Sequence, residues 1–245
     1  MTKVHFDAAV AAGYDETSSE MFRPELLGPA VDFLAALAGD GAALEFGVGT
    51  GRVALPLAAR GVRVHGIDNS QPMLDELAKK PGADAIRTTT GSFADARVEG
   101  TFRLVYLVFN TITNLTTQEA QAACFANAAA HLEPGGRFVV ECYVPKLRRL
   151  PPGERVIAFD LGPGHQGFDE YTDFVGQIQV SHHHWMGDGP PRHFSAPFRW
   201  VWPSELDLMA RLAGLRRCER WAGWTREPFT DESPSHVSVW EKPAA

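Results

Sequence analysis

The stretch Ala43-Leu44-Glu45-Phe46-Gly47-Val48-Gly49-Thr50-Gly51-Arg52 decides the fold. It is a short apolar run that carries one acid and continues into three glycines at alternate positions, which predicts a strand followed by a glycine loop. Glycine has no Cβ, so such a loop adopts positive φ angles and lets a ligand lie against the backbone. We expect a helix over 52–60 to follow and to direct free N–H groups at that ligand. The stretch therefore predicts a site for a nucleotide-like cofactor.

The spacing of these glycines argues against a nicotinamide cofactor. The fingerprint G-x-G-x-x-G requires a glycine at position 52, where this chain has Arg52. Written as E-F-G-V-G-T-G, the stretch instead resembles motif I of the class I S-adenosylmethionine (SAM) dependent methyltransferases. The resemblance implies that the loop faces the methionine part of SAM, with Glu45, Gly47, Gly49 and Gly51 as cofactor-binding residues. An ordinary tight turn between strand and helix is the alternative.

A second acid follows at a distance that supports the cofactor site. Residues 62–68 alternate as a strand and end on Asp68, about twenty residues after the first glycine of the loop. In a doubly wound sheet this acid lies at the carboxyl edge, where it can accept both ribose hydroxyls. The resemblance places Asn69 and Met73, at the start of a helix expected over 70–79, near the adenosine. For Met73, packing in the core is the alternative.

The next two strands complete the predicted cofactor site. After a strand over 83–90, family members usually place an acid that receives the adenine amino group, and this chain has Ser92, followed by Phe93. The strongly apolar run 101–110 predicts a central strand covered on both faces. It ends at Phe109, expected to bind the cofactor, and Asn110, expected at the acceptor. The turn L-E-P-G-G before a strand over 138–143 is a frequent feature of the same family.

The N-terminal segment is expected to close over the cofactor. Residues 1–23 read as polar and irregular, and apolar residues then recur at helical spacing over 27–37, with Gly39 as the end of that helix. The pair Tyr14-Asp15 resembles the start of many small members of the family, so we expect Tyr14 beside the acceptor. The alternative is that its ring only anchors a helix.

A long insertion follows the fifth strand. Prolines interrupt residues 144–202, with runs typical of strands at 155–161, 172–185 and 193–202 and a hairpin turn expected at 186–189. We expect an antiparallel sheet over the carboxyl edge that forms the substrate wall.

This wall carries three consecutive histidines. His182 and His184 share one face of a strand and His183 lies on the other, so the three cannot ligate one metal, and no metal is expected. We expect His182 and His184 to line the acceptor pocket with Tyr143, Asn110 and Tyr14, and one imidazole to take the proton released by an amine. A solvated strand face is the alternative.

The composition fits one α/β domain. The 245 residues, 44% of them hydrophobic, suffice for a Rossmann-like sheet with a cap helix and an antiparallel insertion after the fifth strand. We divide the domain into an N-terminal cap (1–39), a SAM-binding core (40–143), the substrate-wall insertion (144–202) and a C-terminal part (203–245). The last part is expected to contain a helix over 203–214 and strands over 216–224 and 235–241.

Charge and cysteine content exclude several classes. The net charge is −7 and no cationic run is present, which argues against a nucleic-acid partner. No apolar run is long enough to span a membrane, and the N-terminus shows no secretion signal. Three scattered cysteines indicate reduced thiols and not a disulfide scaffold. We expect a cytoplasmic protein, monomeric or homodimeric.

Taken together, these features predict a methyltransferase that converts SAM to S-adenosylhomocysteine. The segment 132–142 resembles aminosugar dimethyltransferases. The segment 208–215, followed by the P-F-T element at 228–230 and a last strand, resembles methyltransferases of linaridin-type peptide N-termini. The resemblance implies transfer to an amine, and less readily to a hydroxyl, of a small molecule or peptide in a natural-product pathway. The alternative is a protein that binds SAM or its product without turnover.

Overall fold

The computed structural model describes residues 6–186 and 191–244 and contains two sheets. The larger has seven strands in the order β10-β11-β5-β4-β1-β2-β3. In chain order these strands are β1 (Ala42–Phe46), β2 (Arg63–Asp68), β3 (Ile86–Thr90), β4 (Phe102–Leu107), β5 (Leu132–Tyr143), β10 (Arg216–Trp221) and β11 (Ser235–Glu241). Strands β1 to β5 pair in parallel and β11 and β10 are antiparallel, so the predicted Rossmann-like fold is confirmed.

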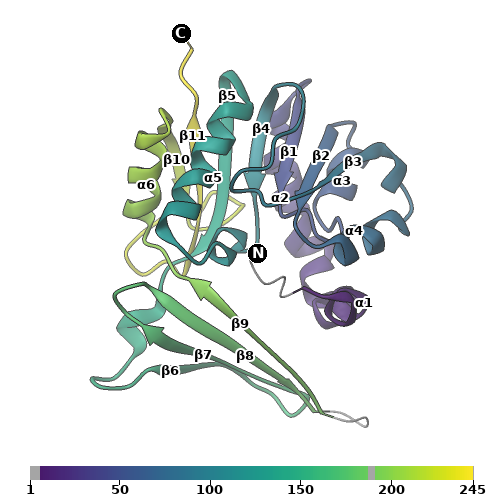
Figure 1. The fold of residues 1–245 in the computed structure, drawn as a ribbon. Helices are drawn as coiled ribbons and strands as arrows, with labels where there is room; N and C mark the ends of the chain where they lie inside the picture. Colours follow the sequence, from purple (N-terminus) through teal and green to yellow (C-terminus); the bar gives the residue numbers. More distant parts are fainter. Residues whose placement is uncertain (1–5, 187–190, 245) are drawn as a thin grey trace.

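Helices cover both faces of this sheet (Figure 1). They are α2 (Pro24–Ala38), α3 (Ala54–Ala59), α4 (Gln71–Ala78), α5 (Gln118–His131) and α6 (Pro203–Leu212), whereas α1 (Ala8–Thr17) lies below the sheet against α4 (Figure 1). Successive residues of one strand belong to different hydrophobic clusters: Leu44 packs with Phe125 of α5, whereas Ala43 packs with Leu34 of α2. This alternation explains why the central strands are apolar on both sides.

The insertion forms the second sheet, whose strand order is β6-β7-β8-β9. Its antiparallel strands are β6 (Val156–Leu161), β7 (His165–Asp173), β8 (Ile178–Trp185) and β9 (Arg192–Arg199). We call this sheet the wall; it extends from the end of the larger sheet where β9 returns towards α6 (Figure 1).

Several predicted boundaries are wrong. Residues 8–17, expected to be irregular, form α1, which begins because the Asp7 carboxylate accepts hydrogen bonds from the N–H groups of Ala9 and Val10. The run 172–185, expected to be one strand, contains a turn at 174–177 that separates β7 from β8. The hairpin turn expected at 186–189 lies largely outside the described residues.

Candidate functional site

The glycine loop after β1 has the geometry that its sequence predicts. Gly47, Gly49 and Gly51 have φ angles of 74°, 54° and 81°. A Cβ atom at Gly47 would lie 2.5 Å from Cγ2 of Thr111, so a side chain there would collide with the segment after β4. The loop is joined to the neighbouring strand, because the N–H of Gly47 donates to the carbonyl of Ile67 at 2.7 Å.

The helix after the loop differs from the prediction. α3 begins at Ala54, two residues later than expected, and has six residues. The N–H of Ala54 is directed at the Glu45 carboxyl group, so this first helical N–H faces the protein interior. Pro56 falls within the first turn, where its missing N–H breaks no helical hydrogen bond. The loop backbone, and not the end of α3, is therefore the surface offered to a ligand.

Asp68 connects the end of β2 to the glycine loop. Its Oδ2 accepts the N–H of Gly49 at 2.8 Å, and its Oδ1 accepts the N–H of Ser70 at 2.8 Å. Burial raises the pKa of this carboxyl group, and these N–H groups oppose the rise. Each carboxylate oxygen accepts one backbone hydrogen bond and keeps a further lone pair for a hydroxyl of a ligand.

Glu45 lies beneath the loop. Only 2% of the residue is exposed, and its Oε2 accepts a hydrogen bond of 2.9 Å from the hydroxyl of Tyr106. Burial raises the pKa of Glu45 to about 8. The carboxyl group is therefore held in the interior by Tyr106 and the first N–H of α3, and its assignment to the cofactor stays a prediction.

The other residues predicted to bind the adenosine have mixed environments. Asn69 is exposed beside Asp68, and Met73 is buried with its Cε next to the Gly49 backbone. The Ser92 hydroxyl accepts the N–H of Ala94 at 3.2 Å. Phe93 is buried in the core, where its ring lies 6.1 Å from that of Phe46. These residues still surround the carboxyl ends of β1 to β3, where the cofactor site was predicted.

Two non-glycine residues with positive φ angles follow β4. They are Phe109 (55°) and Asn110 (60°), and such strain is common at functional sites. The guanidinium of Arg52 lies 5.1 Å from the centre of the Phe109 ring. The Oδ1 atom of Asn110 accepts the N–H of Tyr143 at 3.1 Å. This pair of hydrogen-bonded residues joins the ends of β4 and β5.

Helix α1 lies over the glycine loop. The Asp15 carboxylate accepts a hydrogen bond of 2.6 Å from the hydroxyl of Thr50 and pairs with Lys80. Tyr14 is mostly shielded from solvent, and burial is the main reason that its pKa is raised, while Arg52 opposes the rise. A helix that the sequence analysis did not predict is therefore held against the loop, and the assignment of residues 1–39 as a cap over the cofactor stays a prediction.

The structure does not bring His182 and His184 to the pocket. The β8 residue that lines the pocket described below is Gln179, and strand alternation places His182 and His184 on the opposite face. There His182 Nδ1 lies 2.8 Å from the Ser195 hydroxyl, and its ring stacks on Phe168 at 4.7 Å. These two histidines therefore do not line this pocket, because one residue of register decides which face of a strand is covered, and their role at the acceptor stays a prediction.

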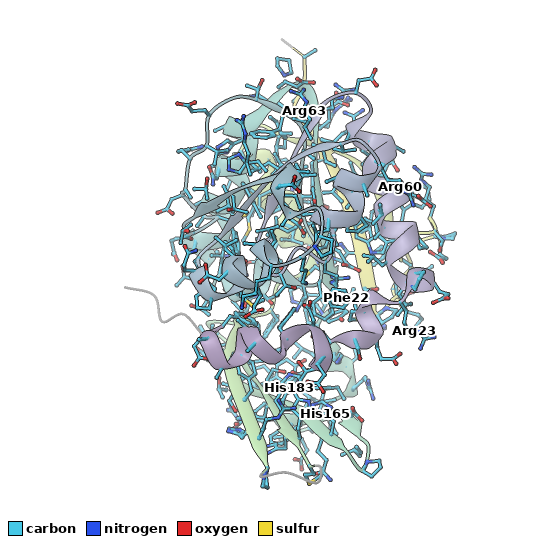
Figure 2. All side chains as sticks on the ribbon, turned by 90° about the vertical axis from the view of Figure 1, so that its right-hand side faces the viewer. Phe22, Arg23, Arg60, Arg63, His165 and His183 are labelled. Atoms are coloured by element: carbon cyan, nitrogen blue, oxygen red, sulfur yellow. The ribbon has the colours of Figure 1, made fainter. Side chains whose placement is uncertain are left out.

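His183 occupies the inner face of the wall instead. Its Nδ1 lies 3.0 Å from Nε2 of His165, and both side chains lie beneath α1 (Figure 2). Burial lowers the pKa of His183 to about 4. Within the described ranges, no group of three or more His, Cys, Asp or Glu side chains is arranged to hold a metal ion.

A pocket lies between the wall and the carboxyl ends of β4 and β5. It contains the predicted residues Asn110 and Tyr143. Its other polar residues, among them Asp169 of β7, were not predicted, because the sequence of β7 did not indicate a separate strand. The buried residues of β7 alternate, but they are Gly167, Asp169 and Tyr171, so its sequence carries no apolar period of two that could have revealed the strand.

Known proteins share the whole of this architecture. A family model described as a methyltransferase domain matches residues 43–136. The cypemycin N-terminal methyltransferase of a Streptomyces species is 30% identical over 238 residues, which cover 94% of this chain and 97% of that protein. The solved CcbJ methyltransferase from Streptomyces caelestis is 40% identical, with a TM-score of 0.80 and 89% of each chain covered.

A more distant structure shows the same fold. SAM-bound CalS10 from Micromonospora echinaspora, an amino pentose methyltransferase, has a TM-score of 0.69 at 23% identity, with 99% of each chain covered. The fold and the glycine loop are those of an enzyme that transfers methyl groups. The chain belongs to the class I SAM-dependent methyltransferases, and SAM is its methyl donor.

Proposed function

We propose that this enzyme methylates an amine of a small molecule or peptide in a natural-product pathway. The observation that carries the proposal is the 30% identity, over 94% of the chain, to a methyltransferase named for a peptide N-terminus. The pocket beside Asn110 and Tyr143 supports it, since it opens at the carboxyl edge, where ligands of open α/β sheets bind. A hydroxyl acceptor is the less favoured possibility.

The residues around the loop fit SAM. We infer that Asp68 accepts hydrogen bonds from the ribose hydroxyls, because both of its oxygens keep a free lone pair next to the loop. The positive φ angles of Gly47, Gly49 and Gly51 leave the loop backbone open to the methionine part. We assign Asn69, Met73, Ser92, Phe93 and Phe109 to the adenosine side, and Glu45 to the cofactor site.

The chemistry asks the protein mainly for positioning. Bound SAM would supply an electrophilic methyl group on a sulfonium. The amine lone pair would form a bond to the methyl carbon as the carbon–sulfur bond breaks, S-adenosylhomocysteine would leave, and the nitrogen would release one proton to water. Correct placement of two reactants is worth about 7–11 kcal/mol of the barrier. Burial raises the pKa values of Tyr14 and Tyr143, so both phenols stay protonated at neutral pH and act as hydrogen-bonding groups, not as bases.

The proposed function is tested with SAM carrying a labelled methyl group. The acceptors are a mixture of short peptides with free N-termini, the same peptides after N-acetylation, and a set of amino sugars and alcohols. We expect label in amines and none in the acetylated peptides. Label found only in hydroxyl groups would refute the proposal.

We also propose that the protein acts in the cytoplasm as a monomer or homodimer. Cys124, Cys142 and Cys218 are all free thiols, which suits a reducing compartment. In the part of the chain that the structure describes, no helix is both long and apolar enough to cross a membrane. Light scattering of the purified protein measures the oligomeric state.

A further inference from the structure

The pocket between the wall and the larger sheet has aromatic sides. Tyr143 comes from β5, Tyr171 from β7, Phe198 from β9 and Trp200 from the segment after β9. Such rings accommodate an apolar side chain, and their faces also attract a cationic amine. Burial, with a contribution from the nearby Asp169, raises the pKa of Tyr171 to about 12, so this ring carries no charge at neutral pH.

One hydrogen-bond acceptor in this pocket is a carboxylate. Asp169 is 6% exposed, and its Oδ1 accepts a hydrogen bond of 2.8 Å from the hydroxyl of Ser181. Its Oδ2 lies 3.6 Å from Nζ of Lys146, which is longer than a hydrogen bond. Oδ2 therefore retains the capacity to accept a hydrogen bond from an amine.

Two residues that carry hydrogen-bond donors, Trp200 and Lys146, line the same pocket. Trp200 is 7% exposed, and its indole N–H is buried without a hydrogen-bond partner among residues 6–186 and 191–244. Buried donors are normally paired, so this N–H calls for an acceptor. The ammonium of Lys146 is the second donor, held 3.6 Å from Asp169 and 5.7 Å from the centre of the Phe159 ring.

An α-amino acyl group has the matching chemistry. It carries an amine, which donates hydrogen bonds, and a carbonyl oxygen, which accepts them, separated by one carbon atom. We propose that this pocket binds the methyl acceptor as the free N-terminal residue of a peptide, with its amine at Asp169 Oδ2 and its carbonyl oxygen at Trp200 Nε1 and Lys146 Nζ. The inference rests on the proposed amine methylation and names its substrate class.

The binding test uses three matched small molecules. L-Leucinamide has the amine, the carbonyl and an apolar side chain; N-acetyl-L-leucinamide has a blocked amine; isopentylamine lacks the carboxamide. D-Glucosamine represents an amino sugar. Binding is followed by intrinsic fluorescence with S-adenosylhomocysteine present, and we expect L-leucinamide to bind about tenfold or more tightly than the other three, the scale of one charge-assisted hydrogen bond. Tighter binding of D-glucosamine, or equal binding of isopentylamine, would overturn the assignment.

Two variants separate the two halves of the recognition. Asp169→Asn is expected to lower the affinity for L-leucinamide about tenfold. The control is Glu170→Gln, which removes the carboxylate of the next residue, on the opposite face of β7, and should leave the affinity for L-leucinamide unchanged. Trp200→Phe keeps an aromatic ring but removes the N–H. It should lower the affinity for L-leucinamide several-fold without changing the affinity for isopentylamine. The affinity of each variant for S-adenosylhomocysteine reports whether it is folded.

The outcomes distinguish this inference from the proposed function. If the enzyme methylates peptide amines while Asp169→Asn and Glu170→Gln bind L-leucinamide alike, the pocket assignment is wrong and the proposed function stands. If L-leucinamide binding depends on Asp169 but label reaches only hydroxyl groups, the pocket binds an α-amino acyl group that is not the methyl acceptor, and both the proposed function and the assignment of the acceptor are wrong.

Discussion

The seven-stranded sheet and the wall differ in how completely their strands are enclosed. The central strands of the larger sheet are covered on both faces, and residues such as Leu44, Leu104 and Phe138 have no exposed surface. In the wall, few side chains are buried to this degree, among them Tyr171 and Ala196. The glycine loop therefore follows strands of a tightly packed sheet. The pocket proposed for the acceptor borders the wall, whose side chains are less buried and can rearrange more easily.

The junction between the two sheets is expected to give the largest effect. Arg199 at the end of β9 is buried and pairs with Glu205 of α6 at 2.6 Å, and it also contacts the side chains of Gln177 and Gln121. Arg199→Ala leaves this carboxylate without its partner and should lower the free energy of unfolding by about 3–5 kcal/mol.

Urea unfolding measures this loss. Arg192→Ala, an exposed arginine of the same strand, is the control and should change stability by less than about 0.5 kcal/mol. Equal stability of the two variants would show that the wall does not depend on this junction.

A buried histidine in the larger sheet should make stability depend on pH. His236 of β11 is fully buried, with Nδ1 2.8 Å from the Ser238 hydroxyl, and burial lowers its pKa to about 3, with a contribution from Arg220. Below pH 6.5 this imidazole is protonated in the unfolded chain but stays neutral in the folded chain, so the free energy of unfolding falls as the pH drops from 6.5 towards 3. Between pH 6.5 and 4.5 the loss from this group is about 2–3 kcal/mol.

The variant His236→Asn should remove this part of the pH dependence. Urea unfolding at pH 6.5 and pH 4.5 gives the difference for the wild type, for His236→Asn and for His193→Asn, a control on the exposed part of β9. If His236→Asn keeps the wild-type difference, the imidazole is not the group responsible.

In the cofactor site, the variant to test is Asp68→Ala. It removes the proposed ribose ligand and the acceptor of the Gly49 N–H, and SAM affinity should fall by about 1–3 kcal/mol, or roughly 5- to 150-fold. Calorimetry measures it, with Asp75→Ala on the exposed side of α4 as the control. Unchanged SAM affinity would remove Asp68 from the site.

The outer face of the wall should give the smallest effect. His182→Ala and His184→Ala alter side chains on the face opposite to Gln179, so each should change kcat/KM by no more than about twofold. Methyl transfer to a peptide amine measures this. A tenfold fall for either variant would support the prediction that these imidazoles serve the acceptor.

The sequence by itself determined the family and the cofactor, and it predicts where the cofactor binds. Glycines at 47, 49 and 51 and the acid at 68 follow apolar strands, and local rules suffice there, because parallel strands bring their carboxyl ends to one edge. Only the tertiary structure decided which residues line the pocket proposed for the methyl acceptor. Which face of β8 is covered, and whether Asp169 and Trp200 meet in one pocket, depends on how the wall docks on the larger sheet, and a half-exposed strand with polar residues on both faces does not encode that choice locally.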